Sequence, residues 1–210
     1  MSFESNKNVT IAVSTAFQDA GDATRAIEIV KTLKNYQPDN LNARIIFISH
    51  GSKFEKKVID LGFEIHYAEP KLPGIGLYQD FGMTIYNLIG TEKLAEEMIQ
   101  GEIEVYKKIK PDFILHGFWP MASLARRMMD KEIPGICFVP LPLVPSFFDV
   151  ISDIPEQLKI FSLLPKQIRL WLLRCTPNFV KSRVPILRQN NIRRAAYKLG
   201  WKMVPLNLSI

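Results

Sequence analysis

The sequence predicts an α/β protein, a single three-layer α/β/α domain built on a parallel sheet, with a helical extension at the C-terminal end. Short apolar runs rich in β-branched residues alternate with segments whose apolar residues recur at helical spacing. The apolar runs are nearly continuous, which is typical of parallel strands that helices cover on both faces. A chain of 210 residues is long enough for one such domain and too short for two.

The predicted strands and helices follow one another through residues 1–140, which form the βα core. We expect strands at 9–14, 43–49, 63–69, 111–117 and 133–140. We expect helices at 23–35, 53–62 and 121–131, and a mostly helical stretch at 78–109 that breaks near Gly90 and Gly101. Ligands of such sheets bind beyond the carboxyl ends of the strands, so the loops after Ser14, His116 and Val139 are the places to look for chemistry.

Residues 141–210 have a different pattern, irregular at first and then helical and basic. The apolar run at 141–151 is interrupted by prolines, which remove backbone donors that a lipid could not replace, so it is not expected to span a membrane. Helical patterns return at 156–174 and 178–199, and Gly200 is expected to end the second of them.

Charge is unevenly distributed along the chain. The net charge is +6, yet residues 157–210 contain eleven Lys and Arg and no acidic residue. Such a region favours an anionic partner, so 157–202 is interpreted either as a peripheral membrane contact or as a flank that packs on another domain. Nucleic acid is not expected, because no recognition motif or stacking platform accompanies the basic residues.

The two cysteines and the N-terminal residues indicate the cellular compartment of the protein. Cys137 and Cys175 lie far apart, with no spacing typical of a metal site, and residues 1–8 have no apolar segment of the kind found in secretory signals. These features predict a cytoplasmic protein, peripheral to a membrane under the first interpretation of the basic region.

The turn after the first strand, STAFQDAGDATR at 14–25, is the first candidate site. Gly21 is expected to allow a tight turn, Asp22 to cap the following helix, and the free amides of that helix to hold an anion or a sugar hydroxyl. The alternative is that Asp22 only caps the helix and Arg25 is solvated. The turn lacks the three glycines of a dinucleotide fingerprint and the GK[ST] of a phosphate-binding loop.

Three stretches resemble the N-terminal, acceptor-binding domain of GT-B glycosyltransferases of the UDP-glycosyltransferase superfamily. They are VTIAVSTAFQDAGDATRAIEIVKTLK at 9–34, KPDFILHGFWPMASLARRMMDKEIPGICFVP at 110–140, and NNIRRAAYKLGW at 190–201. The Gly-Asp pair is similar to the sterol glucosyltransferase branch, whereas plant enzymes have His in that place. The resemblance implies a Rossmann-like domain, half of a GT-B fold, over residues 1–210.

The resemblance also implies a mechanism. In this family the residue at the Gly-Asp turn deprotonates the acceptor hydroxyl, and Asp22 is the residue that matches. Gly21, Arg25, His116 and Trp119 are then expected near a lipid, sterol or small apolar acceptor. Asp19 is a weaker rival for the base, and His116 is otherwise a hydrogen-bonded structural residue. The account requires the first strand to lie in the middle of the sheet and Asp22 to face a cleft.

Departures from the family leave alternatives open. Gly117 stands where many members have an Asp that orients the catalytic His, and the donor-binding C-terminal domain has no counterpart in this sequence. No cofactor is therefore expected in this chain, and a UDP-sugar is expected only with a donor domain or subunit supplied in trans. A non-catalytic acceptor domain that anchors a catalytic partner, and half of a sugar-nucleotide epimerase, are the alternatives.

Overall fold

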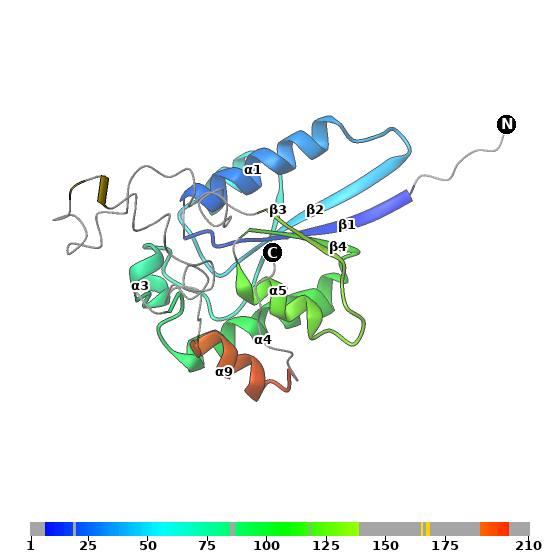
Figure 1. Ribbon diagram of the computed structural model, residues 1–210. Coiled ribbons are helices and arrows are strands. Elements are labelled where there is room, and N and C mark those ends of the chain that lie inside the picture. Colours follow the sequence, from blue (N-terminus) through cyan, green and yellow to red (C-terminus); the bar gives the residue numbers. More distant parts are fainter. Residues whose placement is uncertain are drawn as a thin grey trace.

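The computed structural model describes residues 7–18, 20–84, 87–117, 119–138, 165, 167–168 and 190–201. Five parallel strands form one sheet in the order β3-β2-β1-β4-β5. They are β1 (Lys7–Ser14), β2 (Leu41–Ser49), β3 (Glu64–Tyr67), β4 (Phe113–His116) and β5 (Gly135–Cys137). The first strand is central, as the sequence predicts (Figure 1).

The strand order reverses at β1. The chain moves from β1 to β2 and β3 on one side, then crosses to β4 and β5 on the other. At such a reversal the connections leave β1 and β4 towards opposite faces, which opens a crevice at their carboxyl ends. Residues that follow these two strands are therefore in the position where α/β proteins bind ligands.

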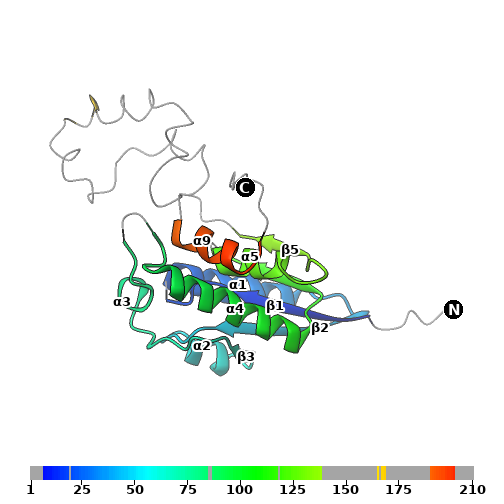
Figure 2. The same ribbon diagram turned by 90° about the horizontal axis from the view of Figure 1, so that it is seen from below.

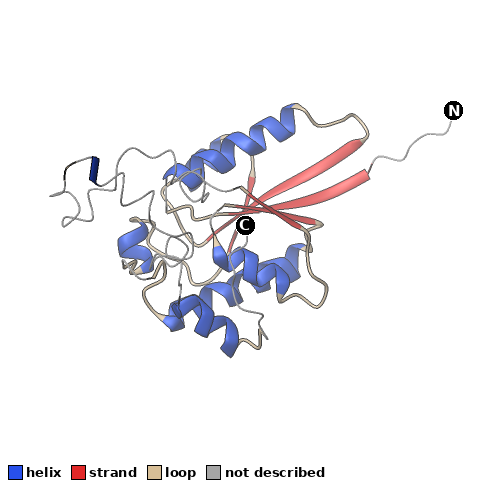
Figure 3. Cartoon of the chain, viewed as in Figure 1, coloured by secondary structure: helices blue, strands red, loops and turns tan. Residues whose placement is uncertain are grey.

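Helices cover both faces of the sheet, which confirms the predicted α/β/α class. The described helices are α1 (Ala20–Asn35), α2 (Glu55–Asp60), α3 (Leu77–Phe81), α4 (Glu92–Ile109), α5 (Pro120–Arg127) and α9 (Asn190–Lys198). Figures 1 and 3 show α1 on one side of the strands and α4, α5 and α9 on the other.

Two apolar cores separate the layers. Val13 and Leu115 belong to the core under α1, whereas their neighbours Ala12 and Ile114 belong to the core under α4 and α5. The alternation follows from the pleat of each strand, which points successive side chains to opposite faces. It also determines on which side of the sheet the side chain at the end of each strand lies.

The region between β3 and β4 differs from the sequence prediction at one glycine. The predicted break near Gly90 is confirmed, because α3 ends at Phe81 and α4 begins at Glu92. The predicted break at Gly101 is wrong, since α4 continues through it. A Cβ atom on Gly101 would lie 1.8 Å from the backbone carbonyl oxygen of Glu69, so this glycine allows α4 to pack closely on the chain after β3.

Other boundaries differ by a few residues. The first helix begins at Ala20 instead of residue 23, and α5 ends at Arg127 instead of residue 131. Of the predicted strand 133–140, β5 covers Gly135–Cys137, and 139–140 lie outside the described residues. Nearly all of the predicted helix 156–174 and residues 178–189 of the next also lie outside them.

The helix α9 packs back onto the body of the protein, against α4 and α5 (Figure 2). Its apolar residues Ile192, Ala195 and Ala196 are buried, and Gly200 follows it with a φ of +90°, as expected for a residue that ends a helix. The Asn191 side chain donates hydrogen bonds to the carbonyl oxygens of Ile89 and Gly90, at 3.0 and 2.8 Å. This part of the basic region thus uses its apolar face for packing.

Within the part of the chain that the structure describes, no helix combines the length and the apolar composition needed to cross a bilayer.

Candidate functional site

The candidate site lies where β1 and β4 end beside the first turn of α1. Thr15 follows β1, Gly117 follows β4, and Asp22 lies in α1. A Cβ atom on Gly117 would lie 2.7 Å from Oγ1 of Thr15 and 3.0 Å from Oδ2 of Asp22. Because Gly117 has no side chain, these two polar atoms and the ring of Phe138, also 3.0 Å from that point, pack closely around it.

Asp22 is buried, with 4% of its surface exposed. Nη1 of Arg25 donates a hydrogen bond to its Oδ1 atom at 2.9 Å, and the half-exposed Arg25 side chain orients the carboxylate from the solvent side. The carboxylate also complements the positive end of the α1 dipole. The structure thus brings together three of the predicted site residues, Gly21, Asp22 and Arg25, in one turn of helix.

Two details of the sequence prediction for this turn are wrong. Asp22 is not the N-cap, because α1 begins two residues earlier, at Ala20. Gly21 consequently adopts helical backbone in the first turn and does not form a tight turn. Asp19, the weaker rival for the base, lies outside the described residues.

Thr15 packs against Gly117 beside Asp22, Cys137 lies next to the Gly117 carbonyl group, and the sequence analysis missed both. Oγ1 of Thr15 is buried and has no hydrogen-bond partner among the described residues. Cys137 is accessible, its Sγ lies 3.5 Å from the carbonyl oxygen of Gly117, and partial burial of the thiol and then the charge of Asp22 raise its pKa. The strand-end rule could have identified Thr15, because it directly follows a predicted strand.

The loop after β1 is held by the loop after β2. Nε2 of Gln18 donates a hydrogen bond to the carbonyl oxygen of Gly51 at 2.7 Å, and Oγ of Ser52 donates to that of Phe17 at 2.6 Å. These bonds are buried or partly buried, so they are shielded from competition with water. The connection that leads into Asp22 is therefore fixed on the side of β2.

His116 and Trp119, the other two predicted site residues, lie on the opposite face of the sheet. His116 shares the face of Ile114, which packs towards α4 and α5. Its Nδ1 lies 2.9 Å from the carbonyl oxygen of Gly117, and its pKa is lowered, first by burial. Trp119 is 2% exposed, lies with its ring 5.2 Å from that of Phe81, and donates its indole hydrogen to Glu102.

The structure therefore separates the predicted set into two groups. Trp119 presents no open ring face to a ligand, and the hydrogen bond of His116 agrees with the structural interpretation left open in the sequence analysis. The buried Glu102, which receives the hydrogen bond from Trp119, was not singled out from the sequence. Nothing in the helical pattern of 78–109 distinguishes it from exposed acids of the same helix, such as Glu97 and Glu104.

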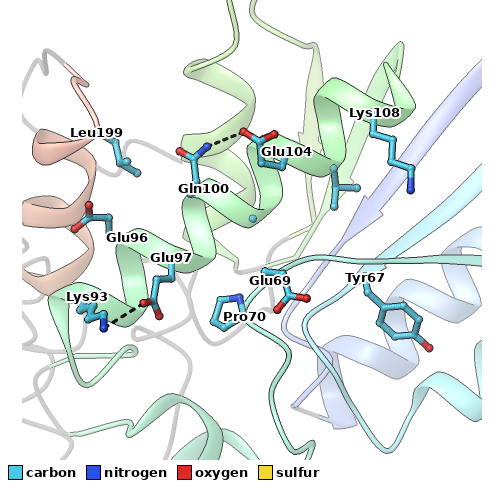
Figure 4. Close-up of a pocket in the computed structure, with 12 residues that line it drawn as sticks. Tyr67, Glu69, Pro70, Lys93, Glu96, Glu97, Gln100, Glu104, Lys108 and Leu199 are labelled. Atoms are coloured by element: carbon cyan, nitrogen blue, oxygen red, sulfur yellow. Dashed lines mark hydrogen bonds and ion pairs between the residues drawn. The ribbon is translucent and has the colours of Figure 1, made fainter.

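Two cavities lie away from this site. An open groove of about 790 Å³ runs between α4 and the chain after β3, with Tyr67, Pro70 and Gly101 in its lining (Figure 4). Figure 4 shows its charged rim, where Lys93 pairs with Glu97 at 3.6 Å. A second cavity of about 640 Å³ lies near the amino end of β2, around Arg44. Neither is lined by Asp22, so the cleft that the sugar-transfer account requires beside this residue is neither of these two cavities.

Two further points concern the content of the site. Among the described residues, no group of three or more His, Cys, Asp and Glu is placed to hold a metal ion. The apolar run at 141–151 lies outside those residues.

No protein-family model and no curated protein matches the sequence. Among solved structures, the chain is similar to the glycotransferase of kitacinnamycin, at 18% identity and a TM-score of 0.43, over 85% of this chain and 42% of the other. It is similar to the glycosyltransferase SnogD from Streptomyces nogalater, at 10% identity and a TM-score of 0.42, over 95% and 44%. It is also similar to UDP-GlcNAc 2-epimerase from Neisseria meningitidis, at 13% identity and a TM-score of 0.38, over 80% and 38%.

The chain thus spans about two fifths of the length of the structures it matches. Similarities this distant concern the fold alone. They leave the activity to be argued from the site, because one fold hosts many chemistries.

Proposed function

We propose that this chain is the acceptor-binding half of a glycosyltransferase, which transfers a hexosyl group from a nucleotide sugar to a hydroxyl group. The acceptor is a lipid, a sterol or another small apolar molecule, and the donor is a UDP-sugar held by a second domain or subunit. The observation that carries the proposal is the buried carboxylate of Asp22, placed at the carboxyl end of the central strand and facing Gly117.

Asp22 acts as the general base in this proposal. The acceptor oxygen attacks the anomeric carbon and forms the new C–O bond, while the bond from that carbon to the phosphate oxygen breaks and UDP leaves with the electron pair. The acceptor proton passes to the Asp22 carboxylate and later to solvent. Arg25 keeps the carboxylate oriented through its bond to Oδ1, which leaves Oδ2 on the side of Gly117.

Thr15 supplies a second contact to the same acceptor hydroxyl. Its hydroxyl both donates and accepts, and Oγ1 is buried beside Gly117 with no hydrogen-bond partner among the described residues. A hydroxyl held between Oγ1 of Thr15 and Oδ2 of Asp22 would have its proton directed at the base. Polar groups that fix one reacting atom in this way reduce the entropy cost of the reaction.

The experiment combines this chain with its donor-binding half and measures transfer of labelled hexose from UDP-sugars to extracted lipids and sterols. Asp22→Asn is expected to lower kcat by a factor on the order of 10² to 10⁴, the usual contribution of a general base. Asp60→Asn, at an exposed position on α2, is the matched control and should turn over normally. Unchanged turnover of Asp22→Asn would remove Asp22 from the mechanism.

The assay can contradict the proposal in two ways: sugar transfer that does not depend on Asp22, or no sugar transfer at all. The first would leave a glycosyltransferase with another base. The second, together with retained binding of an acceptor or of a catalytic subunit, would favour the non-catalytic acceptor domain.

A further inference from the structure

A buried carboxyl group lies on the other side of the sheet from Asp22. Glu102, in the middle of α4, has no exposed surface. Its Oε1 atom accepts a hydrogen bond from Oγ of Ser14 at 2.5 Å and another from Nε1 of Trp119 at 2.9 Å. A carboxyl group placed so deeply is costly unless it is hydrogen-bonded, and these two bonds offset part of that cost, although Oε2 has no hydrogen-bond partner among the described residues.

The two donors belong to the segments that form the candidate site. Ser14 is the last residue of β1 and directly precedes Thr15. Trp119 follows Gly117 by two residues and is the N-cap residue of α5. One carboxylate oxygen therefore ties together the ends of β1 and β4, from which Thr15 and Gly117 extend towards Asp22.

The end of β2 reaches the same carboxyl group. Nε2 of His50 lies 3.8 Å from Oε1 of Glu102, and its ring packs 6.0 Å from that of Trp119. Nδ1 of His50 lies 3.3 Å from the carbonyl oxygen of Pro70, which only accepts, so Nδ1 carries the hydrogen. Glu102 is thus packed against residues at the carboxyl ends of three neighbouring strands, β2, β1 and β4.

We propose that Glu102 is a positioning residue for the candidate site, which holds Thr15 and Gly117 at a fixed separation beside Asp22. It acts through the hydrogen bonds from Ser14 and Trp119 and touches no ligand itself. The importance of the site rests on the proposed function, but the positioning itself is measurable without any activity.

Cys137 provides the measurement. Its thiol lies 3.5 Å from the carbonyl oxygen of Gly117, and burial, followed by the charge of Asp22, raises the pKa of the thiol. Among the described residues, Arg126 also acts on the thiol and lowers its pKa. Because the thiolate is the form that reacts, the pH dependence of alkylation reports the surroundings of Gly117 and Asp22.

The experiment measures iodoacetamide alkylation of Cys137 against pH, in native buffer and in a Cys175→Ser background. We expect Glu102→Leu, which cannot accept hydrogen bonds, to lower the apparent thiol pKa by about half a unit and to raise the rate at pH 7 about threefold. Glu102→Gln retains an amide oxygen that accepts both bonds, so the pH dependence of its alkylation should match that of the parent protein. Glu104→Gln, at an exposed position two residues further on α4, is the matched control.

Ser14→Ala removes one donor with almost no change of volume, so it is the alternative test variant if Glu102→Leu does not fold. It is expected to shift the profile in the same direction by a smaller amount. Asp22→Asn should also lower the thiol pKa, since it removes the charge that raises it.

Each contrary result has a distinct meaning. A folded Glu102→Leu or Ser14→Ala protein with the parental profile would overturn the positioning role. A Glu102→Gln profile shifted as far as that of Glu102→Leu would do so too, because charge and not hydrogen bonding would then matter. An Asp22→Asn profile identical to the parent would overturn the site geometry and this inference with it. Failure of the sugar-transfer assay alone would leave the inference standing and count only against the proposed function.

Discussion

Gly101 gives the most sharply determined prediction for the fold. In an unobstructed helix, replacing an interior glycine by alanine stabilises the protein by about 1 kcal/mol. At Gly101, however, the added Cβ would lie 1.8 Å from the carbonyl oxygen of Glu69, with the backbone carbon and nitrogen of that residue at 2.8 and 2.9 Å. All three atoms are backbone, so no side-chain rotation relieves the contact, and α4 or the chain after β3 has to move.

Overpacking of this kind typically costs 1–3 kcal/mol, and we place Gly101→Ala at the upper end of that range. After subtraction of the helix propensity gain, the free energy of unfolding should fall by about 2 kcal/mol. With a urea dependence of about 2 kcal/mol per molar, the midpoint of unfolding drops by about 1 M.

The assay is urea denaturation followed by circular dichroism, with Gln100→Ala as the control on the exposed neighbouring position of α4. The control should remain within about 0.5 kcal/mol of the parent, as surface substitutions usually do. A Gly101→Ala protein as stable as the parent, or more stable, would refute the close contact between α4 and the chain after β3.

Further predictions concern α4, pH and the site. Thr91→Ala should cost about 1 kcal/mol of stability in the same urea assay and Thr91→Ser very little, because Oγ1 of Thr91 caps α4 by accepting from the amide of Leu94 at 3.1 Å. The stability of the protein should decline as pH falls below about 6.5, the ordinary pKa of histidine. Burial lowers the pKa of His50 and of His116 in the folded state, so the unfolded chain binds more protons in that range. Urea titrations at pH 7.5 and 5.5 measure the decline, and a His116→Gln protein with an unchanged slope would contradict the contribution of His116. Gly117→Ala should weaken acceptor binding far more than it changes stability, since its Cβ would fill the volume between Thr15 and Asp22 while meeting only side-chain atoms, which can shift. Equal acceptor affinity of Gly117→Ala and the parent, measured by calorimetry, would contradict that location for the hydroxyl.

The fold class could be predicted from the sequence because parallel strands covered on both faces are apolar along their whole length. Residues 9–14 and 43–49 show this pattern, and the alternation with helical segments predicts their parallel order. The break at Gly101 could not be predicted correctly. Glycine usually weakens a helix, and only the contact with Glu69, more than thirty residues away, shows that it is required here.

The candidate site was predictable in part. The strand-end rule and the glycine-aspartate turn led to Asp22, which the structure places in the first turn of α1 beside Gly117. The same rule could not show which face His116 and Trp119 occupy, because the direction of a side chain at a strand end depends on the register of β4. Glu102 was missed since a single buried acid on an amphipathic helix has no local signature.

The central claim is that an acceptor hydroxyl binds between Asp22 and Thr15, and the most direct measurement is a crystal structure of the chain with the acceptor found in the transfer assay. We predict that the acceptor oxygen lies within about 3.2 Å of both Oδ2 of Asp22 and Oγ1 of Thr15, the usual reach of a hydrogen bond. An acceptor bound in the open groove along α4 (Figure 4), with its hydroxyl remote from Asp22, would contradict the claim.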